Sequence, residues 1–146
     1  MAFRFALASV LKYRESLEKQ AYLALARVLK DLAEVEAQLS RMEQWCAESA
    51  RRREAETARG IVSVHLQRAY ERELELEKQR DDLRVQQQEL KIKREQYLKA
   101  YDFARQKHEV LKELRSRQLD GYQTEEAKRE QNRIDDLFLS RRKTGG

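Results

Sequence analysis

The sequence contains almost none of the residues that interrupt helices. Proline is absent from its 146 residues, and Gly60 is the only glycine before Gly121. Proline and glycine are the strongest breakers of a helical pattern, whereas Leu, Ala, Glu, Gln, Lys and Arg, which dominate this chain, favour helices. The sequence therefore predicts an all-α protein with two long helices and one break between them.

Cysteine, histidine and long apolar segments are also scarce. Cys46 is the only cysteine, so no intramolecular disulfide can form, which fits a reducing compartment. The two histidines are far apart, and the chain has no HExxH motif, cysteine pair or glycine-rich phosphate loop. It shows no signal peptide and no stretch apolar enough to span a membrane. We expect a cytosolic protein that is not an enzyme and has no catalytic residues, cofactor or metal.

Charge is abundant but nearly balanced, with 31 basic and 26 acidic residues and a formal net charge of +5. A charged fraction of 39% suits helices that each bury only one stripe. A nucleic-acid-binding protein would concentrate its positive charge, so we expect no nucleic acid partner. The single tight cluster, Arg51 to Arg53, is either a solvated face or a docking site for an acidic partner.

Apolar or small residues recur at alternating steps of three and four along the first segment, about residues 5–58. They are Leu25, Val28, Leu32, Val35, Leu39, Met42, Cys46 and Ser49. Such heptads are typical of a left-handed coiled coil. Upstream, Leu17, Ala21 and Leu25 follow one another at two steps of four, which indicates a stutter.

The seam of each helix is the stripe of a and d positions that packs against the other helix. In the second segment, about residues 63–119, only half of the seam positions are apolar. Its apolar positions are Ala69, Leu76, Leu83, Leu90, Tyr97, Ala104 and Leu111, and between them fall Glu73, Arg80, Gln87, Arg94, Tyr101 and His108. Gly60 can end the first helix in the left-handed conformation, with residues 59–62 as the tip and Ile61 and Val62 closing it. So short a link makes the helices antiparallel.

These patterns predict one domain, residues 1–146, folded as a long antiparallel two-helix coiled-coil hairpin with its tip near Gly60. Leu39 would then lie near Leu83. We expect Gly121 to break or kink the second helix, and residues 120–146 to form a less ordered tail, helical only marginally because it is so polar. Because the second helix fills the seam of the first, we expect a monomer.

Trp45 is the only tryptophan and directly precedes the seam position Cys46. With Gln38, Met42 and Ser49 it forms a second stripe beside the core. The side chain either folds over the coiled coil and shields it, or stays exposed as an anchor for a partner. Tryptophan and methionine are both frequent at interaction surfaces.

The chain resembles the FliJ family of flagellar export proteins. The resemblance lies in the opening from Phe3 to Glu15, the Leu-Ala-Leu-Ala step at Leu23, the Gly-Ile-Val-Ser tip at Gly60, and the closing segment Lys128 to Asp136. FliJ-like proteins are antiparallel two-helix coiled coils similar in shape to the stalk subunit of rotary ATP synthases. The resemblance implies a non-enzymatic part of the flagellar type III export apparatus, peripherally associated with the inner membrane.

The resemblance also implies partners and the residues that meet them. FliJ-like proteins insert into the ring of the export ATPase FliI, promote its assembly, contact the cytoplasmic domain of the export gate FlhA, and escort export chaperones. The positions that match the gate-facing surface are Gln38, Met42, Trp45 and Leu76. The terminal end of the hairpin would face the ATPase ring, with Leu7, Leu11, Arg14, Arg133, Asp135 and Asp136.

Three other interpretations fit parts of the same pattern. A stalk protein of a virulence type III secretion system would have the same shape and a different ATPase. A generic coiled-coil tether would homodimerise instead of remaining a monomer. A nucleic-acid-binding arm would use Arg51 to Arg53, against the nearly balanced charge.

Overall fold

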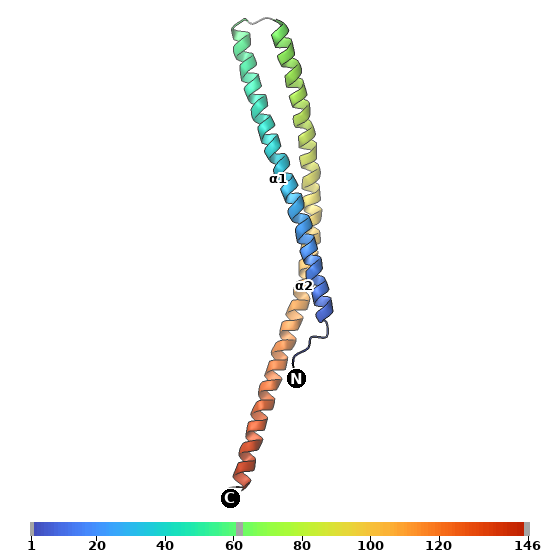
Figure 1. The fold of residues 1–146 in the computed structure, drawn as a ribbon, viewed down its shortest axis with the longest axis vertical. Coiled ribbons are helices and arrows are strands. Elements are labelled where there is room, and N and C mark those ends of the chain that lie inside the picture. Colours follow the sequence, from blue (N-terminus) through green and yellow to red (C-terminus); the bar gives the residue numbers. More distant parts are fainter. Residues whose placement is uncertain (1, 61–62, 145–146) are drawn as a thin grey trace. The chain divides into compact units, whose positions relative to one another are not determined.

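The computed structural model describes residues 2–60 and 63–144 of the chain. Two helices account for nearly all of them: α1, Ala8–Ala58, and α2, Ser63–Thr144. The helices pack against each other as an antiparallel hairpin, and the described residues contain no strand (Figure 1). The predicted all-α hairpin is confirmed.

The chain divides into two compact units, which are described separately. The hairpin unit comprises Ala21–Tyr101, and the terminal unit comprises Met1–Gln20 together with Asp102–Gly146. Each unit therefore contains part of α1 and part of α2.

The core of the hairpin unit is the predicted heptad seam of α1. Leu25, Val28, Leu32 and Leu39 are buried, and the other predicted seam residues, Val35, Met42, Cys46 and Ser49, are half-buried. From α2 the predicted positions Leu76, Leu83 and Leu90 are half-buried, as are the polar residues between them. A seam of this kind hides one stripe of each helix and leaves the rest in water.

The predicted stutter near Ala21 stays a prediction. Leu17 and Glu18 are both half-buried, as is Ala21, and Leu25 is buried. Leu17 as a seam residue gives two steps of four to Leu25, whereas Glu18, which pairs with His108, gives a step of three and a step of four.

The predicted break at Gly60 is confirmed. Gly60 has a φ of 71°, and no other described residue has a positive φ. Only glycine adopts this conformation without steric cost. The amide of Gly60 donates to the carbonyl oxygen of Thr57 at 3.2 Å, which closes the last turn. Ile61 and Val62, which were expected to complete the tip, lie outside the described residues.

The predicted break at Gly121, with an end of the second helix near Leu119, is wrong. Helix α2 is 82 residues long and runs through Gly121 to Thr144. One glycine in a helix costs only about 1 kcal/mol relative to alanine, and helix-favouring residues flank it on both sides. Residues 123–144 are helical and every one of them is exposed. That this tail frays in isolation stays a prediction.

Aromatic side chains hold the start of the chain against α2 in the terminal unit. Phe5 is buried, at 8% exposure. The rings of Phe3 and Tyr122 lie 5.6 Å apart, and the guanidinium of Arg115 lies 5.9 Å from the Phe3 ring. The contacts of the start of the chain therefore reach α2 just beyond Gly121.

Candidate functional site

Trp45 lies at the edge of a groove between the two helices of the hairpin unit. We call it the Trp45 groove; it has a volume of about 620 Å³ and a mostly apolar exposed surface. Its lining comprises Gln38, Arg41, Met42, Gln44 and Trp45 from α1 and Gln79, Asp82, Leu83 and Gln86 from α2. Trp45 itself is 62% exposed. The side chain is therefore exposed and does not fold over the core; that it anchors a partner stays a prediction.

The heptad pattern explains why this groove forms. Met42 and Leu83 occupy seam positions and are half-buried, so they supply apolar surface to the groove. Trp45 precedes a seam position and so lies on the flank of the coiled coil. No third helix in the described part of the chain covers that flank. The groove thus presents apolar surface with a polar border, as a docking site requires.

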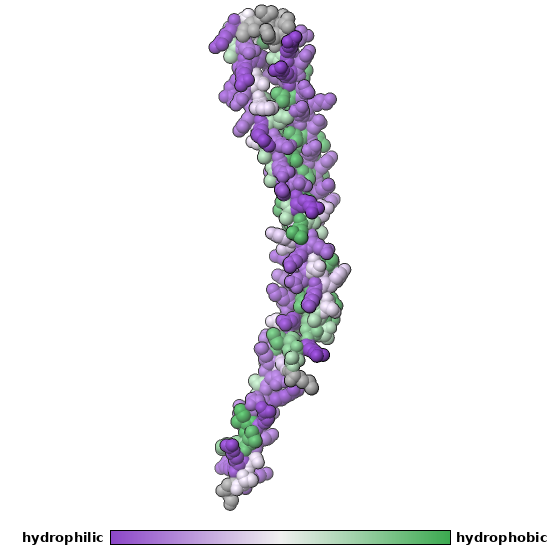
Figure 2. All heavy atoms as spheres, viewed as in Figure 1, coloured by the Kyte–Doolittle hydropathy of each residue, from purple (hydrophilic) through white to green (hydrophobic). Residues whose placement is uncertain are grey.

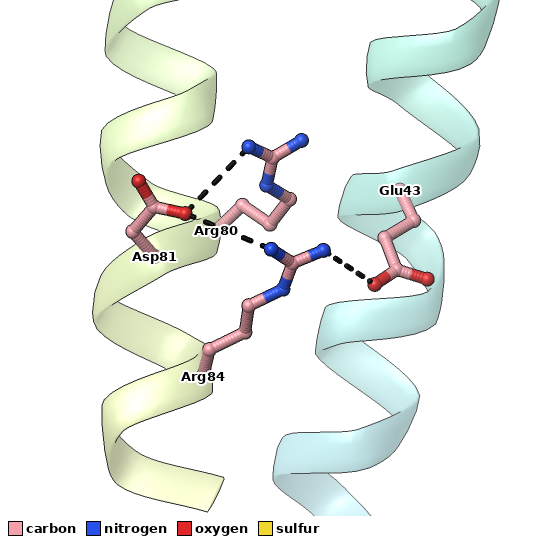
Figure 3. A network of polar contacts seen from close by, with 4 residues as sticks. All are labelled: Glu43, Arg80, Asp81 and Arg84. Carbon is pink, nitrogen blue, oxygen red and sulfur yellow. Dashed lines mark hydrogen bonds and ion pairs between the residues drawn. The ribbon is translucent and has the colours of Figure 1, made fainter.

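Polar side chains bridge the helices at another place in the hairpin unit. The guanidinium of Arg84 lies 3.4 Å from the carboxylate of Glu43 on α1 and 4.0 Å from that of Asp81 (Figure 3). Arg80 lies 3.6 Å from Asp81. Such half-exposed pairs contribute little free energy, roughly 0–1 kcal/mol each. Of these pairs only Arg84 with Glu43 connects α2 to α1; the two that involve Asp81 lie within α2.

Two polar side-chain pairs at seam positions were not predicted from the sequence. Arg53 pairs with Glu73 near the tip, and His108 pairs with Glu18 in the terminal unit. Each pair joins the two helices. The signal was present, because Glu73 and His108 had been placed on the seam of the second segment. Their partners, Arg53 and Glu18, are polar, and the apolar pattern of the first segment does not mark them.

Three of the four residues predicted to face the export gate come together in the structure. Gln38, Met42 and Trp45 line the Trp45 groove, whereas Leu76 does not. Leu76 is half-buried on α2, seven residues before Leu83 and therefore at the same heptad position. It lies along the seam toward the tip from the groove.

The six residues predicted to face the ATPase ring belong to the terminal unit but form two separate groups. Leu7 directly precedes α1 and is 39% exposed, and Leu11 and Arg14 are half-buried on the seam. In the exposed tail, Arg133 pairs with Glu130 at 2.8 Å, Asp135 accepts a hydrogen bond from Gln131 at 3.1 Å, and Asp136 is exposed. The start of the chain reaches α2 at Tyr122, which contacts Phe3. Arg133, Asp135 and Asp136 lie eleven or more residues beyond Tyr122 along α2.

The described residues contain neither a metal centre nor a membrane-spanning helix. No group of three or more His, Cys, Asp or Glu side chains within them could hold a metal ion. No helix in this part of the chain is both long and apolar enough to cross a bilayer.

The fold and the Trp45 groove define a class of protein: a hairpin of two long helices with an open, mostly apolar groove between them. The family model described as flagellar FliJ protein matches residues 3–144. The chain therefore belongs to the FliJ family, a family of stalk-like structural proteins of flagellar type III export. No curated protein and no solved structure matches the chain.

Proposed function

We propose that this protein is the non-enzymatic stalk of a flagellar type III export apparatus. It acts in the cytoplasm, at the inner-membrane export apparatus, inserts into the ring of the export ATPase FliI, promotes assembly of that ring, and couples it to the gate protein FlhA. The observation that carries the proposal is the family match, which spans both helices and both proposed surfaces. Flagellar export is preferred to virulence secretion because the matching family is the flagellar one.

The Trp45 groove supports the proposed contact with the gate. A partly exposed tryptophan beside half-buried Met42 and Leu83 gives a large apolar contact area that a partner can cover. Tryptophan is among the residues that most often dominate the binding energy of an interface. Gln38 at the border can donate and accept hydrogen bonds. We assign Leu76 to the margin of the same contact.

The tail of α2 supports the proposed contact with the ATPase ring. Ile134, Leu137, Phe138 and Leu139 are between 52% and 65% exposed, and they form a hydrophobic cluster near the end of the helix (Figure 2). Isolated helices are rarely stable in water without an apolar face packed on something, so a partner that covers this cluster would stabilise the tail. A ring pore that encloses the helix would cover it, and would bring Arg133, Asp135 and Asp136 against the ATPase.

The test measures ATP hydrolysis and ring formation by the cognate export ATPase with and without this protein. The proposal predicts faster hydrolysis and more assembled rings when the protein is added. A Leu137→Ser, Phe138→Ser variant should lose both effects, and Trp45→Ala is the matched control that should keep both. Absence of stimulation together with absence of co-purification would contradict the proposal.

A further inference from the structure

A second groove lies nearer the tip of the hairpin unit, and arginine dominates its lining. We call it the arginine groove; it measures about 370 Å³. Its lining comprises Ser49, Arg52, Arg53 and Glu56 from α1 and Arg68, Ala69, Arg72 and Glu73 from α2. Four arginines against two glutamates leave the lining net positive.

Most of this positive charge has no partner. Arg53 pairs with Glu73 across the seam. Arg52, Arg68 and Arg72 are exposed, and within the described residues none of the three makes an ion pair or a side-chain hydrogen bond. A guanidinium group presents five N–H donors in a fixed plane, and a carboxylate accepts two of them side by side. Three such groups around one groove form a site for carboxylates.

The spacing of these arginines suits a helical partner. Arg68 and Arg72 are four residues apart on α2, and side chains at that spacing project from one face of a helix about 5–6 Å apart. Arg52 faces the same groove from α1. Two acidic side chains one helical turn apart on a partner would meet Arg68 and Arg72 together, and Arg52 would contact the same segment from its other side.

The two grooves lie on one flank of the hairpin unit. Gln38, Trp45 and Arg52 are each seven residues apart, and so share one heptad position on α1. Arg72, Gln79 and Gln86 share one heptad position on α2 in the same way. Residues at one heptad position stay on one side of a coiled coil, so the two grooves open on the same side, one nearer the tip than the other.

We propose that the arginine groove binds an acidic segment of a protein partner that lies along this flank. The adjoining apolar groove favours a protein over a nucleic acid, because a protein can supply both carboxylates and apolar side chains. Glu56 and Glu73 within the lining also interrupt the positive charge, whereas a phosphate backbone is held by a continuous run of cations. The lining of the arginine groove contains none of the residues assigned to the export contacts.

The test uses fluorescence anisotropy of the full chain with a labelled helical peptide that carries glutamates four residues apart. The probe is compared with a peptide in which every glutamate is glutamine. The groove variant is Arg52→Gln, Arg68→Gln, Arg72→Gln. The matched control, Lys19→Gln, Lys30→Gln, Lys93→Gln, removes the same charge from exposed lysines that line neither groove, and circular dichroism checks that both variants remain helical.

The acidic peptide should bind the unmodified protein and the lysine control with similar affinity, and the groove variant about tenfold or more weakly, since charge-assisted hydrogen bonds are lost. Three results would overturn the proposal. In the first, the acidic peptide does not bind, or binds no better than its glutamine counterpart. In the second, the groove variant and the lysine control weaken binding equally, which would show that the peptide is attracted by the overall positive charge and not by the groove. In the third, single-stranded DNA of equal charge binds more tightly and loses its affinity in the groove variant.

Discussion

Trp45 and Leu32 are both large side chains of α1, but they differ in exposure, at 62% for Trp45 and 4% for Leu32. Removing a buried leucine side chain costs roughly 2–5 kcal/mol because it leaves a cavity. Removing an exposed tryptophan leaves no cavity. Trp45→Ala should therefore change the melting temperature little, whereas Leu32→Ala should lower it markedly, as measured by thermal circular dichroism.

The same exposure gives a prediction for binding. If Trp45 anchors the contact with the gate, Trp45→Ala should weaken binding to the cytoplasmic domain of the gate by tenfold or more, as expected when a dominant interface residue is truncated. Titration calorimetry with the folded variant measures this loss. Unchanged affinity would exclude Trp45 from the contact, and a large fall in melting temperature would show that it belongs to the core.

Glu18 and His108 show how much a polar seam position depends on its partner. Both side chains are largely buried, with 23% of Glu18 and 17% of His108 exposed. His108→Leu should destabilise the protein by about 1–3 kcal/mol, because it leaves the Glu18 carboxylate half-buried without its partner. Adding Glu18→Leu should recover most of the loss, since an apolar pair can replace a buried polar pair at little cost. Urea denaturation measures the free energy of unfolding of the single and the double variant. A double variant less stable than His108→Leu alone would contradict the prediction.

At the scale of elements, two glycines of similar appearance in the sequence have opposite roles. An added Cβ atom would meet nothing within 4 Å at either Gly60 or Gly121, so only the backbone distinguishes them. Gly60 has a φ of 71°, and Gly60→Ala should destabilise the hairpin by about 1–2 kcal/mol. Gly121 lies inside α2, and Gly121→Ala should stabilise that helix by about 0.5–1 kcal/mol. Thermal unfolding measures the melting temperature of both variants. A change of the same sign and size in the two would contradict the prediction.

The helices were predictable from the sequence because their signal is repeated many times. Eight seam positions of the first segment, Leu25 to Ser49, agree with the burial found in α1, and the tip at Gly60 agrees with the positive φ of that residue. The end of α2 was not predictable in the same way. A lone glycine such as Gly121 ends a helix only when the longer segments on both sides of it stop favouring one, and that balance of small terms is not visible as a pattern.

The site was predictable in part for a similar reason. Heptad spacing places Gln38, Met42 and Trp45 beside the seam, so their common groove follows from the period. Whether the Trp45 side chain folds over the core or stays exposed depends on packing against the other helix, which no local pattern contains. The arginine groove was harder still, because Arg52 and Arg72 lie twenty residues apart and only the antiparallel register brings them to one groove.

At the scale of the whole molecule, the tail and the hairpin should be separable. No residue from 123 to 144 is buried, so removing residues 123–146 deletes no part of the core. The shortened protein should retain its melting temperature and its affinity for the gate domain, while losing the stimulation of the ATPase. Thermal unfolding, calorimetry and ATPase assays measure the three properties. Full stimulation by the shortened protein would show that the tail is not the part that enters the ring.

The state of association follows from how the seam is filled. The buried stripe of α1 in the hairpin unit faces α2 of the same chain, so it offers no surface on which a second copy could pack. A tether that homodimerises would need a free seam. Light scattering should therefore give the mass of one chain, 17.4 kDa, at concentrations well above those of the binding assays. The exposed cluster at Ile134 to Leu139 is the one place where we expect weak self-association, and removing residues 123–146 should abolish it. A dimer that persists in the shortened protein would mean that two chains share their seams, and the monomeric hairpin would then be wrong.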